Sequence, residues 1–172
     1  GRNYKEIDAA IEKEYIKLPK SGLMFFPYLG GTATPQWYDG ERGSFFGIGL
    51  ETTDTMMAAA VLEGTAFNIR ANIEIMETLG RECSGINVFG GGSNSSIWLR
   101  MIADATGKTV RKTQIEETAC LGAAMKAAES VGTIGKTLPN SKIEIKPDSK
   151  AKKEYDVKYM KYKNIESKLY GR

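Results

Sequence analysis

The chain has 172 residues, of which 41% are hydrophobic and 26% are charged, so it has room for one ordinary globular domain or a large piece of a bigger one. It contains no histidine, which excludes Ser-His-Asp and Cys-His catalysis and any zinc site that relies on imidazole. Phosphoryl transfer stays compatible, because it depends mostly on positioning and electrostatics. No apolar run approaches the roughly 20 residues that span a bilayer, and the N-terminal residues do not resemble a secretory signal.

The cysteines and the charge distribution favour a cytoplasmic protein with a basic tail. Cys83 and Cys120 are too few for a disulfide framework, so we expect two reduced, packed thiols. The net charge of +3 comes from residues 142–172, which hold ten basic and five acidic side chains. The chain does not begin with methionine, which favours processing or truncation.

The first elements along the chain are a helix and two short strands. Residues 4–17 place apolar side chains at near-helical spacing, and Pro19 is expected to end that helix. Residues 23–26 are predicted to form a buried strand and residues 44–48 a second one. The intervening residues 27–43 are rich in glycine and proline, which predicts a loop.

A long helix is predicted next, with Thr53 or Asp54 as its N-cap and an end near Leu79, where Gly80 follows. Its helical periodicity defines one stripe that we expect to face the core. The stripe contains Met57, Val61, Leu62, Thr65, Ile69, Ile73 and Met76.

The remaining pattern alternates strands and helices. Residues 86–89 predict a strand that runs into a tight turn of three glycines, and Ser93 or Asn94 is the expected cap of a helix that ends near Gly107. A short strand near Val110, an alanine-rich helix over residues 116–131, a linker, and a charged helix over residues 149–170 complete the order. Such alternation predicts an α/β fold.

The glycine turn is the most informative chemical feature. Without Cβ atoms the backbone can approach a ligand closely, and the N-terminus of the following helix favours an anion such as phosphate. A plain strand-to-helix turn explains Gly90–Gly92 about equally well. The pattern matches neither a dinucleotide fingerprint nor a Walker A loop, and the Gly135-Lys136-Thr137 run fails as a Walker A motif because an alanine-rich helix precedes it.

The tail interleaves lysines with tyrosines, which would also suit nucleic-acid binding. However, Tyr155, Tyr159 and Tyr162 fall at helical spacing, and Ile165 and Leu169 extend the same stripe. We therefore expect a helix that lays this face on a domain, with its lysines solvated on the other face.

Several acidic residues are candidates for a catalytic or metal-binding role. No pair has the spacing of a two-carboxylate or metal site, so none is nominated. Those weighed are Asp39, Glu41, Glu51, Asp54, Glu63, Asp104, Glu116 and Glu117.

Four ordered motifs resemble the C-terminal domain of the FGGY family of carbohydrate kinases, which includes xylulokinase-, gluconate kinase- and glycerol kinase-like members. They lie at residues 22–35, at residues 42–50 with 59–70, at residues 88–98 with 102–107, and at residues 117–124. Two departures stand out. Thr32-Ala33 replaces a frequent Glu-Arg, so a xylulokinase-like substrate preference should not be assumed, and Met56 replaces an expected polar residue.

The resemblance implies a ribonuclease-H-like fold of the actin and hexokinase type, incomplete at its N-terminal end, that binds ATP and Mg²⁺ in the intact enzyme. It implies no catalytic residue and no metal ligand in this chain, because the catalytic aspartate and the Gly-Thr phosphate loop of such kinases precede this region. The helix that starts near Glu117 would pack behind the nucleotide pocket. The implied nucleotide-binding residues are Gly90, Gly91, Gly92, Ser93, Asn94 and Ser95, of which Gly91 and Ser95 match the family's clearest nucleotide contacts.

On this basis residues 1–141 are expected to form a partial nucleotide-binding domain, and residues 142–172 a linker and a helix that packs on it. The chain alone is expected to be inactive, since it lacks both the catalytic aspartate and the Gly-Thr phosphate loop. The sugar or polyol is expected to be held mainly by a missing N-terminal domain. ATP or ADP is the expected partner, with no nucleic acid or membrane, and with a homodimer as one option. The alternatives are a standalone nucleotide-binding module of the actin-like superfamily and an unrelated dehydrogenase or methyltransferase.

Overall fold

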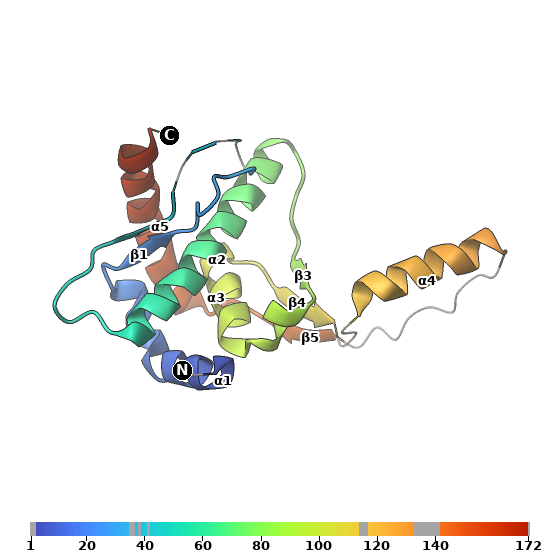
Figure 1. The fold of residues 1–172 in the computed structure, drawn as a ribbon, viewed down its shortest axis with the longest axis horizontal. Coiled ribbons are helices and arrows are strands. Elements are labelled where there is room, and N and C mark those ends of the chain that lie inside the picture. Colours follow the sequence, from blue (N-terminus) through green and yellow to red (C-terminus); the bar gives the residue numbers. More distant parts are fainter. Residues whose placement is uncertain are drawn as a thin grey trace.

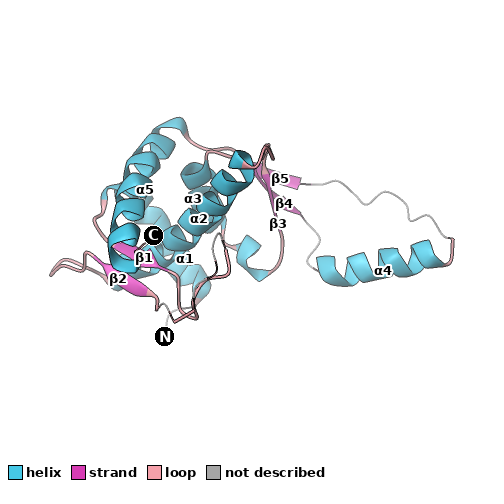
Figure 2. Ribbon diagram, turned by 90° about the horizontal axis from the view of Figure 1, so that it is seen from above, coloured by secondary structure: helices cyan, strands magenta, loops and turns pink. Residues whose placement is uncertain are grey.

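The computed structural model describes residues 3–34, 37, 39–40, 42–113, 117–132 and 142–171. A body of packed helices carries two small sheets on its sides, and helix α4 stands away from this body in both views (Figures 1 and 2). The Gly135-Lys136-Thr137 run lies outside the described residues. Within the described part, none of the helices combines the length and apolar character needed to cross a membrane.

Helix α1 (Tyr4–Glu14) begins with a capping box. The Asn3 side chain accepts a hydrogen bond from the Glu6 amide, and the Glu6 carboxylate accepts one from the Asn3 amide. A 3-10 turn, η1 (Tyr15–Lys20), follows directly and includes Pro19. The predicted helix is therefore confirmed, with its last residues wound as 3-10 structure rather than as α-helix.

Strand β1 (Met24–Phe26) pairs antiparallel with β2 (Ser44–Phe46) and is buried on both faces. Phe26 stacks on Tyr162 of the C-terminal helix with ring centroids 4.5 Å apart, whereas Phe25 on the opposite face contacts Phe45 at 4.6 Å. The alternation of side chains along a strand thus places β1 between two clusters of apolar residues.

Helix α2 (Asp54–Thr78) crosses the body and is capped by Thr53, whose hydroxyl accepts from the Met56 amide. The stripe predicted to face the core is only partly right, because Ile73 is buried but Met76 is 49% exposed and the others are half-buried. Small residues allow neighbouring elements to approach a different face. The buried residues of α2 are Ala59, Ala60, Glu63, Gly64, Ala66, Phe67 and Ile73.

Gly64 shows why that face is built from small residues. A Cβ atom at this position would lie 2.1 Å from the carbonyl oxygen of Phe25. The helix can therefore contact β1 only because position 64 has no side chain. The glycine at position 64, within the family-like motif at residues 59–70, is thereby explained by packing.

The second sheet has the order β3-β4-β5, with β3 (Ile86–Val88) parallel to β4 (Val110–Thr113) and β4 antiparallel to β5 (Lys142–Ile145). Helix α3 (Ser96–Thr106) connects β3 to β4 and ends at Gly107, which has a positive φ. The residues of β5 were expected in a linker. They form a strand that pairs antiparallel with β4, and Arg111 Nε lies 2.8 Å from Glu144 Oε1 across the two strands.

Helix α5 (Ser149–Tyr170) packs on the body as predicted, through Tyr155, Tyr159 and Tyr162. Two details of the prediction are wrong. Leu169 is 49% exposed, so the buried stripe ends earlier. Lys158, expected in solvent, is 2% exposed.

Helix α4 (Thr118–Ser130) has no buried residue. It therefore does not pack into the body as α5 does, although the two follow neighbouring strands of one sheet.

Candidate functional site

A hollow of about 650 Å³ lies where β3 and β4 end, between the glycine turn and the start of α4. In a parallel pair of strands both carboxyl ends meet at one edge, which is the usual ligand-binding edge of α/β proteins. The residues that line it are Phe89, Gly90, Gly91, Ser93, Asn94, Lys112, Thr113, Glu117, Thr118, Ala119 and Ile143.

The three glycines have three different roles in this geometry. Gly90 has φ +81°, a conformation that disfavours any other residue. A Cβ atom on Gly92 would lie 2.4 Å from the ring of Trp98, so that glycine is needed for packing. Only Gly91 combines an ordinary φ with open space, since a Cβ atom there would meet nothing within 4 Å. Gly91 therefore borders the hollow although neither its backbone conformation nor local packing requires a glycine there.

The polar residues after the glycines also have different roles. Ser93 is buried and its hydroxyl donates to the carbonyl oxygen of Gly90 at 2.7 Å, which holds the turn. Asn94 is exposed and lines the hollow. Ser95, rather than Ser93 or Asn94, is the N-cap of α3, because a 3-10 turn, η2 (Gly91–Asn94), precedes the helix. Its hydroxyl accepts from the Trp98 amide at 3.2 Å, and neither Ser95 nor Gly92 lines the hollow.

Lys112 is a site residue that sequence reasoning missed. It lies opposite Val88 in the β3–β4 register, and its Nζ donates to Asn94 Oδ1 at 2.9 Å. A cation thus lies beside the glycine turn. Local spacing could not have indicated it, because the two strands are far apart in the chain and only their parallel pairing brings Lys112 to Asn94.

The first turn of α4 also borders the hollow, through Thr118 and Ala119. The expected packing of that helix behind the pocket is only partly seen, because its remaining turns extend away from the body. Cys120 in the same turn is exposed and Cys83 is half-buried, and both are free thiols. The expectation that both thiols are packed is therefore wrong for Cys120.

Two of the acidic candidates from the sequence, Glu63 and Asp104, are buried. Glu63 Oε2 lies 2.5 Å from Lys158 Nζ, and Lys158 also donates to the Leu18 carbonyl oxygen at 3.0 Å. Burial raises the pKa of Glu63, although Lys158 acts to lower it.

Asp104 accepts hydrogen bonds from the Tyr15 hydroxyl and, at 2.6 Å, from the Asp148 amide. Burial raises the pKa of the Asp104 carboxyl. Because both acids face packed elements rather than the hollow, they are structural groups.

Glu41 and Glu116 lie outside the described residues, and Glu117 lines the hollow. Among the residues that the structure describes, no group of three histidine, cysteine or acidic side chains could hold a metal ion.

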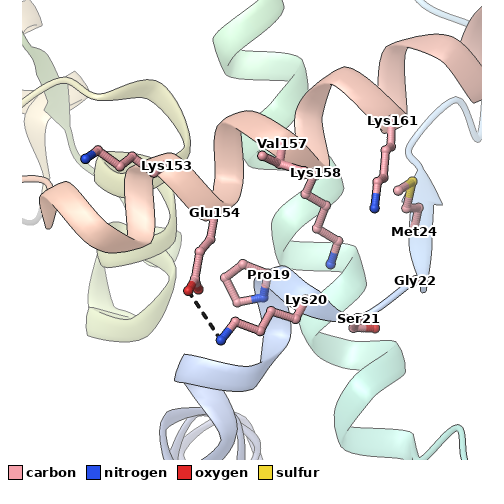
Figure 3. A pocket seen from close by; sticks show the side chains of 10 residues that line it. All are labelled: Pro19, Lys20, Ser21, Gly22, Met24, Lys153, Glu154, Val157, Lys158 and Lys161. Carbon is pink, nitrogen blue, oxygen red and sulfur yellow. Dashed lines mark ion pairs between the residues drawn. The ribbon is translucent and has the colours of Figure 1, made fainter.

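A second hollow, of about 470 Å³, lies between η1, β1 and α5 and is rich in lysines (Figure 3). Two of these lysines are already paired. Lys20 Nζ lies 3.4 Å from Glu154 Oε1, and Lys158 is buried against Glu63. This hollow also lies at the start of β1 rather than at the carboxyl end of a strand, and no glycine turn borders it, so it is a weaker candidate for a phosphate-bearing ligand.

Comparison with known proteins agrees with the resemblance in the sequence. The model of the C-terminal domain of the FGGY family of carbohydrate kinases matches residues 4–131. A probable L-xylulose kinase of Haemophilus influenzae is 33% identical over 93% of this chain and 32% of its own length. A xylulose kinase of Staphylococcus epidermidis is 38% identical over 67% of this chain and 23% of its own length.

The fold is shared as well. The xylulose kinase of Rhodospirillum rubrum superposes with a TM-score of 0.81 and 22% identity, over 98% of this chain and 34% of that one. The architecture is therefore the α/β fold of the actin and hexokinase type, as the resemblance implied. The chain spans about a third of the length of these relatives. It belongs to the FGGY family of carbohydrate kinases and corresponds to that family's C-terminal domain.

Proposed function

We propose that this chain is the nucleotide-binding part of an ATP-dependent carbohydrate kinase, which transfers the γ-phosphate to a hydroxyl of a sugar or polyol. The observation that carries the proposal is the glycine turn at the carboxyl end of β3, where Gly91 borders a hollow of about 650 Å³. The family of the chain gives the reaction class. A standalone nucleotide-binding module is not favoured, because the relatives that match are carbohydrate kinases about three times as long.

The residues present fit a nucleotide. Gly90 and Gly91 have no Cβ atom, and the space where one would stand is open for at least 4 Å. The backbone can therefore approach a phosphate or ribose closely. Ser93 fixes the turn, and Asn94 offers a side-chain amide to the ligand. We propose Gly90, Gly91, Gly92, Ser93, Asn94 and Ser95 as the nucleotide-binding segment, with Gly91 and Asn94 in direct contact and Gly92, Ser93 and Ser95 supporting the turn.

Mg²⁺ would neutralise charge on the nucleotide's phosphates. It would arrive with the nucleotide, since the described residues hold no cluster of ligands for it. The base that activates the sugar hydroxyl is proposed to lie in the part of the enzyme that precedes this region. We therefore expect the chain alone to phosphorylate no sugar, and ATP-dependent turnover on any pentose, hexose or polyol would contradict this.

We also propose a cytoplasmic location, which agrees with the two free thiols. A homodimer stays a prediction. Tyr155, Tyr159 and Tyr162 are buried, so these rings are not available to stack on bases. Their burial argues against nucleic-acid binding by the tail.

Gly91→Val tests the proposal directly. The branched side chain should enter the hollow and abolish ADP binding, while the melting temperature stays unchanged because the position is open. Gly30→Val is the matched control, since Gly30 also has open space and does not line the hollow. Calorimetry and thermal unfolding measure the two effects. Retained ADP affinity in a normally folded Gly91→Val variant would contradict the proposal.

A further inference from the structure

Lys112 occupies the position in the sheet from which a side chain can reach a ligand held by the glycine turn. β3 and β4 are parallel, and Val88 pairs with Lys112 just before each strand ends. The chain leaves β3 into Phe89 and the glycine turn, and β4 runs beside β3 (Figure 1). The register therefore places Lys112 on the adjacent strand at the same edge. Both the turn and Lys112 border the same hollow.

The side chain of Lys112 is oriented by a neutral group. Its Nζ donates to Asn94 Oδ1 at 2.9 Å, and no acidic side chain among the described residues lies within ion-pair distance of it. An ammonium group has three donors, so two remain after the bond to Asn94. The contact with Asn94 restricts the lysine without neutralising it, which lowers the entropy lost when a ligand binds.

The environment of Lys112 differs from that of two other lysines of the molecule. Lys108 pairs with Glu77 at 2.5 Å and Lys158 with Glu63 at 2.5 Å, so their charges are already balanced. Glu117 is the acidic residue among those that line the hollow, and its Oε2 lies 4.0 Å from the thiol of Cys120 rather than against Lys112. Among the described residues, the hollow therefore presents an ammonium group that is not ion-paired, next to a backbone turn suited to phosphate.

We propose that Lys112 binds the phosphate chain of the nucleotide and makes this hollow selective for nucleoside di- and triphosphates over nucleosides. The inference rests on the proposed function, because it assigns a residue within the same site. A lysine ammonium acts on phosphate as a point charge, so the contact needs no fixed bidentate geometry. Asn94 then has two roles: it faces the ligand, and it holds the lysine in place.

The test compares ADP with adenosine on the intact 172-residue chain and its variants. Lys112→Gln keeps a side chain that can donate to Asn94 but removes the charge. We expect ADP to bind about tenfold more weakly to it, or weaker still, while adenosine affinity changes by less than about twofold. Lys146→Gln removes the same charge from an exposed residue outside the hollow and should leave both affinities unchanged. Ligand-observed NMR measures the affinities of ADP and adenosine.

A chemical readout checks the contact without using affinities. Acetylation of lysines in the wild-type chain, followed by mass spectrometry, should be slowed at Lys112 by ADP and not by adenosine, with Lys146 unaffected by either.

The outcomes separate the two proposals. If ADP binds the wild type and Lys112→Gln binds it equally well, or if ADP does not protect Lys112, the role of Lys112 is wrong and the proposed function stands. If ADP and adenosine weaken equally in Lys112→Gln, the residue shapes the pocket and does not bind phosphate. If the wild type binds no ADP, the proposed function fails, and the role of Lys112 fails with it.

Discussion

Helix α4 and helix α5 each follow a strand of the same three-stranded sheet, yet their surroundings differ. α5 buries three tyrosines and Lys158, and the hydroxyl of Tyr159 donates to Glu74 of α2 at 2.9 Å. α4 buries no residue, and only its first turn borders the candidate nucleotide hollow. The α5 interface should therefore contribute strongly to the stability of the body, whereas the exposed turns of α4 should contribute little to it.

The sharpest test of the α5 interface is its buried ion pair. Lys158→Met leaves the carboxylate of Glu63, 3% exposed, without its cation, and we expect a loss of about 3–5 kcal/mol in the free energy of unfolding. The double variant Glu63→Gln with Lys158→Met removes both charges and should recover most of that loss. Urea denaturation measures both. A single variant as stable as the wild type would show that the pair does not hold α5 to α2.

Gly64→Ala tests the contact between α2 and β1. Alanine usually stabilises a helix interior relative to glycine by roughly 0.5–1 kcal/mol. Here the added methyl group would lie 2.1 Å from the backbone oxygen of Phe25, so we expect a destabilisation of about 1–3 kcal/mol instead. Gly122→Ala in α4, where nothing lies within 4 Å, is the control and should follow the usual sign. Thermal unfolding distinguishes the two signs.

The pH dependence of stability should reveal the buried acid at Asp104. Its pKa is raised by burial, so the folded state binds a proton more tightly than the unfolded state does. Its contribution is therefore most favourable at or below about pH 4, where the unfolded carboxyl titrates, and is lost as the pH rises through the raised folded pKa. The groups around it are Tyr15, Arg100 and Asp148.

Asp104→Asn removes this titration. The stability of the wild type relative to this variant should fall as the pH rises from about 4 towards neutrality, in a series of urea denaturations. A difference that is constant with pH, or that grows towards neutrality, would contradict the raised pKa.

The smallest effect is expected in α4. Met125 is 48% exposed, so Met125→Ser should change the free energy of unfolding by less than about 0.5 kcal/mol. Met101→Ser in α3, where the side chain is fully buried, should cost about 2–5 kcal/mol. Similar losses for both variants would mean that α4 is packed after all.

The sequence was sufficient where local signals decide the structure. Thr53 as a cap and the end of α3 at Gly107 both follow from short-range chemistry. The position of the glycine turn could be predicted for the same reason, and the order of the motifs identified the family.

The features that the sequence did not predict depend on contacts between residues far apart in the chain. Lys158 was expected in solvent together with the other lysines of this helix, although it lies at helical spacing from Tyr155 and Tyr162; its partner Glu63 lies 95 positions away. β5 is only four residues long and gains its partner through antiparallel pairing with β4. Lys112 enters the candidate site through the parallel pairing of β3 and β4, which no local pattern specifies.

The placement of α5 has a consequence for how the molecule is made. Tyr155 lies against Tyr15 and Phe67, and Tyr162 lies against Phe26, so the core joins segments from both ends of the sequence. Contacts between such distant residues require a long loop to close, which slows folding. During synthesis, α1, β1 and α2 therefore emerge from the ribosome with their shared apolar face still uncovered, and the core is completed only once α5 has been translated.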